Sequence, residues 1–392
     1  MKIVFITDYL TIGSGGPRFL FNVLKILCKS LNWKLVIVTG YIDKDMKREI
    51  ALTNGLIELV LLDIFQPYQS RVYPYKQPFR CLRFLYEAAK VLNEVMNETH
   101  DKTNTMVIHV HNPLPNLIPY LMTRKIRSKR ISIVCTIHHF EETYSLDSML
   151  SKIISVPYQY IIETNIPCNV IHVPSRYVKE TLVKKRFFYK KNIIIIPPGI
   201  DLDRYLANPK KHEDGLFIMI GRLEPRKHYD HAIAAFKIVA KHRPDYKLVI
   251  IGDGPLKHEL IQLIERYGLE RNVFLLSSVD EETKLKLLSR VEALIHLGYP
   301  EGFGIVILEA LASGTPVIAY NVPPINEIVK NGTTGVLVKK DSIIDLAKAI
   351  MNIDRYSFDP NELRRSTKKY DINTIVNKFK VLYRYLATEL KR

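Results

Sequence analysis

Short runs of Val, Ile and Leu alternate along the chain with longer stretches in which apolar residues recur every three or four positions. The short runs predict buried strands and the longer stretches predict helices that cover them. A first series of strand-like runs lies at 2–7, 34–39, 57–62, 106–110, 131–137, 169–173 and 192–196, and a second at 216–220, 247–251, 273–276, 293–297, 316–319 and 336–338. This alternation is typical of α/β proteins with parallel sheets between layers of helices.

The two series are separated by a break in the pattern. Pro197-Pro198-Gly199 and the polar stretch 208–215 follow the first series, and turn residues of this kind mark domain boundaries. We therefore predict two Rossmann-like domains facing each other across a cleft, one over residues 1–200 and one over 201–371. A last helix, over about 372–392, follows the second sheet and could pack back on either domain.

Composition narrows the protein class. Hydrophobic residues make up 47% and charged residues 25% of 392 residues, as in an ordinary globular protein. No apolar run approaches the roughly 20 residues of a transmembrane helix, and the first residues lack the layout of a signal peptide. Four cysteines, Cys28, Cys81, Cys135 and Cys168, are widely spaced in apolar surroundings. We expect a cytoplasmic protein with reduced cysteines.

The net charge is +17 and most of it falls in the first half. Two basic clusters stand out there, and the second of them encloses aromatic residues. The clusters are Arg124, Lys125, Arg127, Lys129, Arg130, and Lys184, Lys185, Arg186, Lys190, Lys191 around Phe187, Phe188, Tyr189. They suit solvated helix ends, an anionic membrane surface or a phosphorylated acceptor. Nucleic acid is less favoured because no nucleic-acid-binding motif accompanies the charge.

Open parallel sheets bind ligands at the carboxyl ends of their strands, so the loops after the strands of the second domain are the candidates for chemistry. The first loop carries Gly221, Arg222 and Lys227 before a predicted helix, a combination that suits a diphosphate. The second, 252–255, has two glycines that permit close backbone approach or simply form a turn.

The third loop combines a carboxylate with a glycine turn. It reads Glu301-Gly302-Phe303-Gly304, and a second carboxylate, Glu309, follows eight residues later on a predicted helix. A carboxylate accepts hydrogen bonds from sugar hydroxyls, and glycine amides approach a ligand closely. These residues suit recognition of a sugar and of a ribose diol.

This segment resembles glycosyltransferase family 4, a retaining family with the two-domain GT-B architecture. The resemblance rests on Glu301-Gly-Phe-Gly, Glu309-Ala-Leu-Ala and Gly-Thr-Pro-Val-Ile-Ala at 314–319, with Gly221-Arg222-Leu223 and Lys227 upstream. It extends to Gly15-Gly16 in the first domain, to 197–201, and to 327–338. After Gly16 the chain has Pro17 and Arg18 where the family has a small and then an acidic residue, so the acceptor side is less defined than the donor side.

The resemblance implies a role for each matched residue. It assigns the donor diphosphate to Arg222 and Lys227, with Gly15 and Gly16 facing the phosphates, and the ribose to Glu309. The transferred sugar falls to Glu301 and the amides of Gly302, Phe303 and Gly304. The base falls to the loop around Ser277 and Ser278. His138 lies where the family carries an active-site histidine, although His139 is adjacent and His111 ends another strand.

The expected activity is transfer of a hexose from a UDP- or GDP-linked donor to a glycan, lipid-linked or small-molecule acceptor. The first domain would bind the acceptor and the second the donor. We expect no metal or other cofactor, because no Asp-x-Asp metal ligand is evident outside 201–203 at the domain boundary. The alternatives are an epimerase or a pyridoxal-phosphate-dependent phosphorylase on the same architecture, and a non-catalytic protein that binds sugar nucleotides or nucleic acid.

Overall fold

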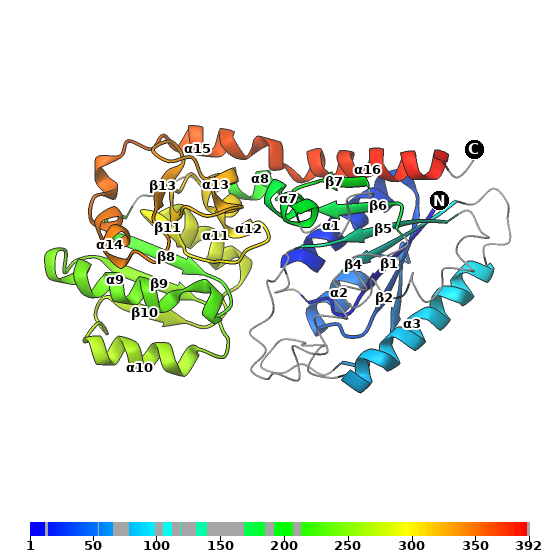
Figure 1. The fold of residues 1–392 in the computed structure, drawn as a ribbon, viewed down its shortest axis with the longest axis horizontal. Coiled ribbons are helices and arrows are strands. Elements are labelled where there is room, and N and C mark those ends of the chain that lie inside the picture. The colour runs from blue at the N-terminus through cyan, green and yellow to red at the C-terminus, as the bar shows by residue number, and fades with distance from the viewer. Residues whose placement is uncertain are drawn as a thin grey trace. The chain divides into compact units, whose positions relative to one another are not determined.

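The structure, a computed structural model, describes residues 1–11, 15–53, 55–65, 78–98, 105–111, 118, 131–138, 168–184, 192–206 and 213–389. The chain forms two compact units (Figure 1). Unit 1 comprises Met1–Pro198 together with Asn373–Arg392, and unit 2 comprises Gly199–Ile372. The end of the chain therefore belongs with the N-terminal unit.

Unit 1 is built on a parallel sheet of seven strands in the order β3-β2-β1-β4-β5-β6-β7. The strands are β1 (Lys2–Thr7), β2 (Lys34–Thr39), β3 (Ile57–Leu61), β4 (Met106–His111), β5 (Ile131–Thr136), β6 (Val170–Val173) and β7 (Asn192–Ile195). In the centre, Lys2 to Thr7 pair in register with β2 on one side and with β4 on the other. Each predicted run of this series is a strand to within one residue at either end.

The described helices of unit 1 are α1 (Gly15–Leu31), α2 (Lys44–Ala51), α3 (Pro78–Glu98), α7 (Arg176–Lys184) and α16 (Ile372–Glu389), whose first residue belongs to unit 2. α1 buries the apolar face that includes Phe21 and Leu24. The carboxylate of Asp43 caps α2 by accepting from the Met46 amide at 2.8 Å. These helices cover the sheet and close its core.

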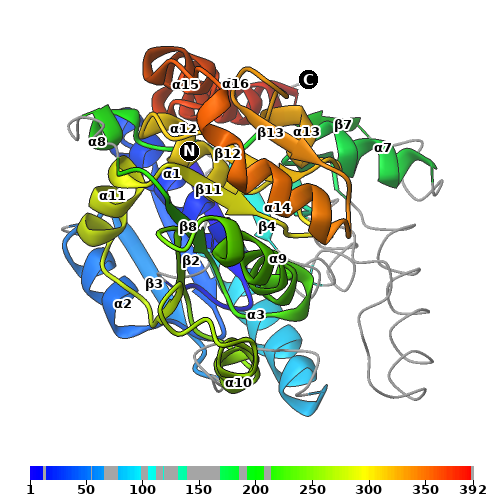
Figure 2. The ribbon, with the colours of Figure 1, turned by 90° about the vertical axis from the view of Figure 1, so that its left-hand side faces the viewer.

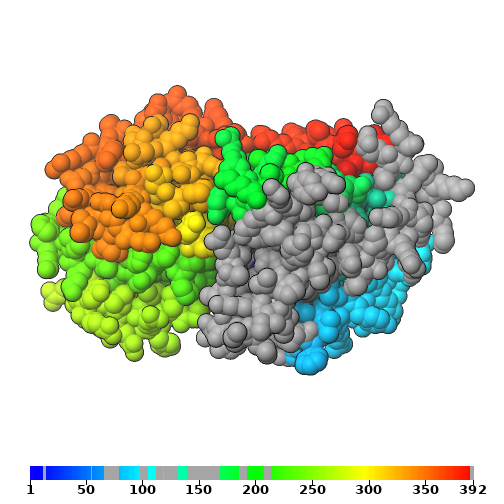
Figure 3. Space-filling view, in the orientation of Figure 1, coloured from blue at the N-terminus to red at the C-terminus, as the bar shows by residue number. Residues whose placement is uncertain are grey.

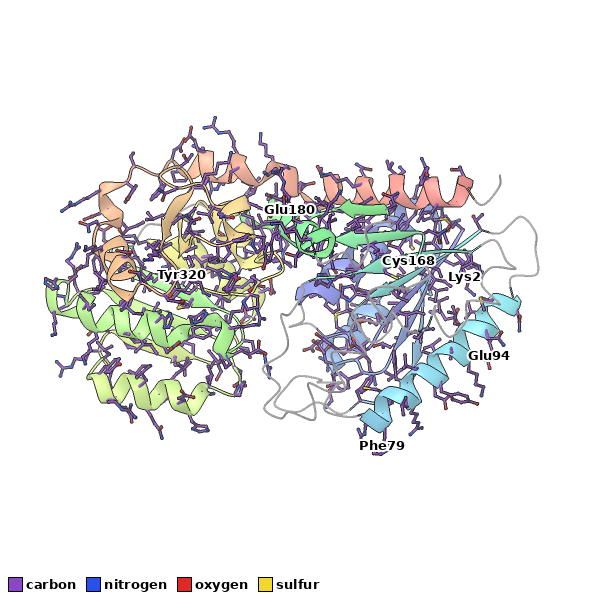
Figure 4. The ribbon with its side chains drawn as sticks, in the orientation of Figure 1. Lys2, Phe79, Glu94, Cys168, Glu180 and Tyr320 are labelled. Atoms are coloured by element: carbon purple, nitrogen blue, oxygen red, sulfur yellow. The ribbon has the colours of Figure 1, made fainter. Side chains whose placement is uncertain are left out.

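α3 is an exception to this burial, because one side of its first turns is apolar and open to solvent. Phe79, Leu82 and Tyr86 follow one another at helical spacing and are 85%, 65% and 70% exposed. Phe79 lies at the end of α3 and is labelled in Figure 4. None of the helices in the described part of the chain has the length and hydropathy of a membrane-spanning segment.

Unit 2 holds a second parallel sheet, of six strands, in the order β10-β9-β8-β11-β12-β13. Its strands are β8 (Leu216–Ile220), β9 (Lys247–Ile251), β10 (Val273–Leu276), β11 (Ala293–His296), β12 (Val317–Tyr320) and β13 (Gly335–Val338). This second series also matches the predicted runs to within a residue. The α/β architecture with two parallel sheets is confirmed.

Helices cover this sheet as well. They are α8 (Leu202–Leu206), α9 (Tyr229–His242), α10 (Lys257–Tyr267), α11 (Glu281–Arg290), α12 (Ile305–Ala312), α13 (Ile325–Ile328), α14 (Ile343–Met351) and α15 (Pro360–Thr367), with a short 3-10 turn, η2, at Pro225–Lys227. α9 packs against α10 and α14, whereas α12 packs against α8, α11 and α15 (Figure 2). Gly268, in the left-handed conformation, ends α10.

The two ends of unit 2 are hydrogen-bonded to each other. The Ile200 amide donates to Tyr370 O at 3.0 Å, and the Ile372 amide donates to Ile200 O at 2.9 Å. The segment that enters unit 2 and the segment that leaves it are therefore held side by side.

α16 joins unit 1 through a buried polar network. His109 contacts Tyr383 Oη through Nδ1 and Thr136 Oγ1 through Nε2, both at 2.6 Å. Thr136 Oγ1 in turn lies 2.8 Å from His172 Nδ1. Phe379 packs edge-on against His172 with ring centroids 5.0 Å apart. The last helix is thus an integral part of the N-terminal core.

Candidate active site

The loops after β8 and β9 are packed directly against each other. The Leu223 amide donates to Asp253 O at 3.0 Å. A Cβ on Gly252 would lie 1.9 Å from Gly221 O, and one on Gly254 would lie 2.6 Å from Leu223 O. The glycines of the 252–255 turn are therefore required by this backbone contact, which fixes the path of the 221–227 loop.

Basic side chains of the 221–227 loop meet two carboxylates. Arg222 Nε lies 2.8 Å from Glu224 Oε1, and Arg226 Nε lies 3.2 Å from Glu224 Oε2. Arg226 Nη1 also lies 3.2 Å from Glu301 Oε2, and Lys227 Nζ donates to the same oxygen. The structure thus brings Lys227 and Glu301, both assigned to the donor from the sequence, into contact, and adds Arg226 and Glu224.

The pairing of Lys227 with Glu301 follows from the strand order. β8 and β11 are neighbours in the sheet, so the loops that follow them leave the same edge side by side. The side chains of Lys227 and Glu301 are 14% and 15% exposed. Burial opposes ionisation of Glu301, but the charges of Lys227 and Arg226 outweigh it and hold the pKa of Glu301 well below its usual range.

His296 is a further side chain at this place that sequence reasoning missed. It ends β11, is 4% exposed, and its Nε2 lies 3.9 Å from Glu301 Oε2. This Nε2 has no hydrogen-bond partner among the residues that the structure describes. Burial, together with the charge of Lys227, lowers the pKa of His296 to about 3, so its imidazole is neutral. The sequence signal that could have identified His296 is a polar residue at the end of an apolar strand.

Glycines leave the space around these groups open. A Cβ on Gly298 would lie 2.9 Å from Glu301 Oε2 and 3.2 Å from His296 Nε2. Gly304 has φ 94 and caps α12 in the left-handed conformation. Gly302 and Phe303, between them, are buried, and Phe303 packs edge-on against Tyr370 at 5.6 Å.

The second carboxylate, Glu309, lies on α12 and has its own lysine. Lys284 Nζ of α11 lies 2.9 Å from Glu309 Oε1 and 3.1 Å from Glu281 Oε1. Burial opposes ionisation of Lys284, but the charges of Glu309 and Glu281 raise its pKa. Burial is the largest cause of the raised pKa of Tyr205, and the charges of Glu309 and Glu281 raise it further. The Tyr205 hydroxyl also forms a hydrogen bond with Glu309. Sequence reasoning identified neither Lys284 nor Tyr205, because each lies on a different helix.

Ser277 and Ser278 lie in the exposed segment after β10. Lys257 Nζ donates to Ser277 Oγ at 3.0 Å. The Gly252 amide donates to Leu276 O at 3.0 Å, which ties this segment to the 252–255 turn. The proposed base-binding segment therefore emerges at the same sheet edge as the loops that carry Arg222 and Lys227.

In unit 1 the structure brings Gly16 and His138 together. Gly16 lies in the first turn of α1, and a Cβ on it would lie 2.7 Å from His138 Nε2. His138 and His111 are also neighbours: their ring centroids are 4.3 Å apart and their Nε2 atoms are in contact. His111 is buried and His138 half-buried, so both expected candidates belong to one pair, while His139 lies outside the described residues.

Two family models together match most of the chain. Residues 16–204 match the family model described as Glycosyltransferase Family 4, and residues 206–373 match Glycosyl transferases group 1. The chain is 24% identical over 304 residues to N-acetyl-alpha-D-glucosaminyl L-malate synthase of Bacillus anthracis, covering 74% of this chain and 77% of that protein.

A second relative is matched over a shorter length. Alpha-monoglucosyldiacylglycerol synthase of Streptococcus pneumoniae is 28% identical over 214 residues, which is 51% of this chain. The chain spans about half the length of that relative, 48%.

Among solved structures, HepE of Anabaena, in complex with UDP and glucose, superposes with a TM-score of 0.71 at 18% identity, over 98% of this chain and 100% of that one. This likeness concerns the fold, which is GT-B. Both halves of the chain thus match the same group of enzymes, and the protein belongs to the family 4 glycosyltransferases.

Proposed function

We propose that this glycosyltransferase transfers a hexose, with retention of anomeric configuration, from a UDP- or GDP-linked donor that is held by unit 2. The observation that carries the proposal is the partly buried cluster of Lys227, Arg226, Glu301 and His296 at the ends of β8 and β11. Two cations, an ionised carboxylate and a neutral imidazole converge there beside glycines. Such a group suits a ligand with both a diphosphate and sugar hydroxyls.

In this proposal the diphosphate binds the cations that form ion pairs with the carboxylates in the absence of donor. Lys227 and Arg226 share Glu301, and Arg222 and Arg226 share Glu224. A bound diphosphate offers more oxygens than a carboxylate, so the cations turn to it and Glu301 is released for the sugar hydroxyls. As the anomeric bond breaks, negative charge grows on the leaving phosphate, and fixed cations stabilise it.

The rest of the donor is assigned along the same edge. Glu309, held by Lys284, accepts hydrogen bonds from the ribose, and the amides of Gly302 to Gly304 face the transferred sugar. Gly15 and Gly16 are also assigned to the donor phosphates, as the resemblance implies. The base lies against the backbone around Ser277 and Ser278.

The transfer itself needs no covalent enzyme intermediate in this proposal. The anomeric carbon–oxygen bond to the phosphate breaks, a bond to the acceptor oxygen forms on the same face, and the acceptor proton passes to the leaving phosphate oxygen. His138, next to Gly16 and His111, would contact the sugar. Transfer is independent of a metal, since Lys227, Arg222 and Arg226 supply the positive charge.

The acceptor and the place of action are a further part of the proposal. We propose an acceptor that is lipid-linked or phosphorylated, and a protein that works in the cytoplasm at an anionic membrane surface. Two observations support this: the relative named as a glucosyldiacylglycerol synthase, and the exposed Phe79, Leu82 and Tyr86 beside Arg83 on α3. The basic clusters around 124–130 and 184–191 would add attraction, although only Lys184 of them lies within the described residues.

A thermal-shift screen against UDP, GDP, ADP and their sugar conjugates tests the donor assignment, because a ligand of the folded state raises the unfolding midpoint. We expect a shift with one base family that is lost in Lys227→Ala and retained in Lys241→Ala, a change of an exposed lysine on α9. No shift with any nucleotide, or an equal shift in Lys227→Ala, would refute the proposed donor site.

A further inference from the structure

Two histidines and an aspartate gather on unit 2 outside the residues assigned to the donor. His228 and His231 lie at the start of α9, and Asp341 lies just before α14. One ligand atom from each of the three lies within 4.8 Å of the others. We call this group the His-His-Asp cluster.

Neighbouring groups orient both imidazoles. The rings of His228 and His231 stack with centroids 4.8 Å apart and an interplanar angle of 27°. His231 Nδ1 lies 2.6 Å from the hydroxyl of Tyr320, a buried residue that ends β12 and is labelled in Figure 4. His228 hydrogen-bonds the backbone of Tyr299. A hydrogen bond at one ring nitrogen fixes the tautomer and the ring orientation, as is usual for histidines that bind metals.

The carboxylate reaches the imidazoles from the other segment. Asp341 Oδ1 lies 3.9 Å from His231 Nδ1, while Lys340 approaches the other carboxylate oxygen, Oδ2, at 3.9 Å. Asp230 Oδ2 lies 3.8 Å from His231 Nε2 but is not part of the cluster. The donors are thus two imidazoles and one carboxylate.

The backbone at this place is unusual at both ends of the cluster. His228 has φ 51 and Asp341 has φ 63, values in the left-handed region that residues other than glycine rarely adopt. Such a conformation is strained and persists where the surroundings hold it, often at sites that bind ligands.

We propose that the His-His-Asp cluster binds a divalent transition-metal ion of the zinc class. Two imidazoles and a carboxylate are a usual zinc donor set, with water in the remaining position. Ligand atoms that now lie up to 4.8 Å apart would draw closer around the ion. Asp341 is 56% exposed, so the ion reaches the site from solvent.

Binding there would join two segments that are far apart in sequence. The green segment that contains α9 and the orange segment that contains α14 lie side by side on the face drawn in Figure 3, and the two helices pack together. The ion would cross-link the start of α9 to the segment before α14. Since His228 directly follows Lys227, the cross-link would also steady the loop that carries this lysine.

The experiment uses the full chain without a purification tag, freed of metal with a chelator and titrated with Zn²⁺ in competition with a chromogenic chelator. We expect one equivalent to bind at micromolar concentration or below. Binding should weaken at least tenfold in His231→Ala, in Asp341→Asn and in His228→Asn, where asparagine tolerates the left-handed backbone. His242→Ala and His258→Ala, changes of exposed histidines, should bind as the parent does.

The second readout is the absorption of bound Co²⁺, which reports coordination geometry without any assay of transfer. Asp341→Asn alters an exposed side chain, so this variant should keep the fold. It therefore tests the site even if a histidine variant fails to fold. Unchanged zinc affinity in Asp341→Asn and His231→Ala, or no binding by the parent at micromolar Zn²⁺, would overturn the proposal. None of these outcomes depends on the donor site.

Discussion

Lys284 lies 2.9 Å from Glu309, and their side chains are 13% and 14% exposed. A buried ion pair of this kind fixes the direction of the carboxylate, and removing one partner leaves an uncompensated charge. We therefore expect Lys284→Met to raise the KM for the sugar nucleotide about tenfold, the equivalent of roughly 1.4 kcal/mol. Steady-state kinetics with varied donor would measure it.

The adjacent lysine on the same helix provides the control. Lys286 is 61% exposed and pairs with Glu282 at 2.7 Å, so Lys286→Met should leave the KM for the donor unchanged. Lys284→Arg should restore part of the affinity. If Lys284→Met raises the KM for a donor without ribose hydroxyls as much as it raises the KM for the normal donor, the lysine does not act through Glu309.

Lys227 and Glu309 lie in separate ion pairs, and each is expected to be needed for transfer. Lys227→Ala and Glu309→Ala should each remove most of the transfer activity. Lys227→Ala removes a cation that stabilises charge on the leaving phosphate, with a loss of about a hundredfold, and Glu309→Ala removes the hydrogen bonds to the ribose. Initial rates at a donor concentration below the KM of the parent would show both losses, with far-UV circular dichroism as the check on folding. Near-normal rates in both variants would contradict the site.

The buried histidines of unit 1 predict a loss of stability in mild acid. Burial lowers the pKa of His172 from 6.5 to about 4, and burial with the charge of His172 lowers the pKa of His109 well below 6.5. The unfolded chain therefore binds more protons than the native chain below pH 6.5. The stabilisation that the two buried, neutral histidines give the native chain is complete above pH 6.5 and is lost as the pH falls towards 4.

Between pH 7 and pH 5 the protonation of His172 should lower the free energy of unfolding by about 2 kcal/mol, and His109 should add to this loss. Trp33, the single tryptophan, lies in unit 1 between α1 and β2, so its fluorescence in urea titrations reports on this unit. His172→Gln should reduce by about one the number of protons taken up on unfolding, as given by the slope of the free energy of unfolding against pH. An equally steep dependence in that variant would show that other groups cause it.

The exposed apolar side of α3 predicts binding to membranes. Phe79→Ser combined with Leu82→Ser should reduce sedimentation with anionic liposomes severalfold, because each apolar side chain loses about 2 kcal/mol of burial in the interface. Val381, exposed on α16, provides the matched control as Val381→Ser. Equal sedimentation of the parent and the double variant would exclude α3 as the contact.

The pattern of the sequence predicted every described strand, because parallel strands buried on both faces read as continuous apolar runs. It also assigned Lys227 and Glu301 to one donor site, since the loops after strands gather at one sheet edge. It did not predict that β11 lies beside β8, which is what pairs these two residues.

The residues that sequence reasoning missed owe their position to packing between elements. Lys284 looks like an exposed lysine of an amphipathic helix until α11 is placed against α12. Glu224 and Arg226 flank Pro225 in a loop whose path depends on the contact of Gly252 and Gly254 with its backbone. The pairing of His111 with His138 depends likewise on β4 and β5 being neighbours. Such relations are properties of the folded sheet and leave no local trace in sequence.

The hydrogen bonds between Ile200 and residues 370 and 372 have a consequence for dissecting the protein. They make unit 2 an inserted module whose two ends emerge together, so residues 199–372 can be excised as one continuous gene segment. Unit 1 is discontinuous and cannot be obtained by truncation after Pro198, because that would remove α16 with the buried Phe379 and Tyr383. Unit 2 is therefore accessible by simple subcloning, whereas unit 1 requires a fusion that joins the C-terminal helix to the first 198 residues.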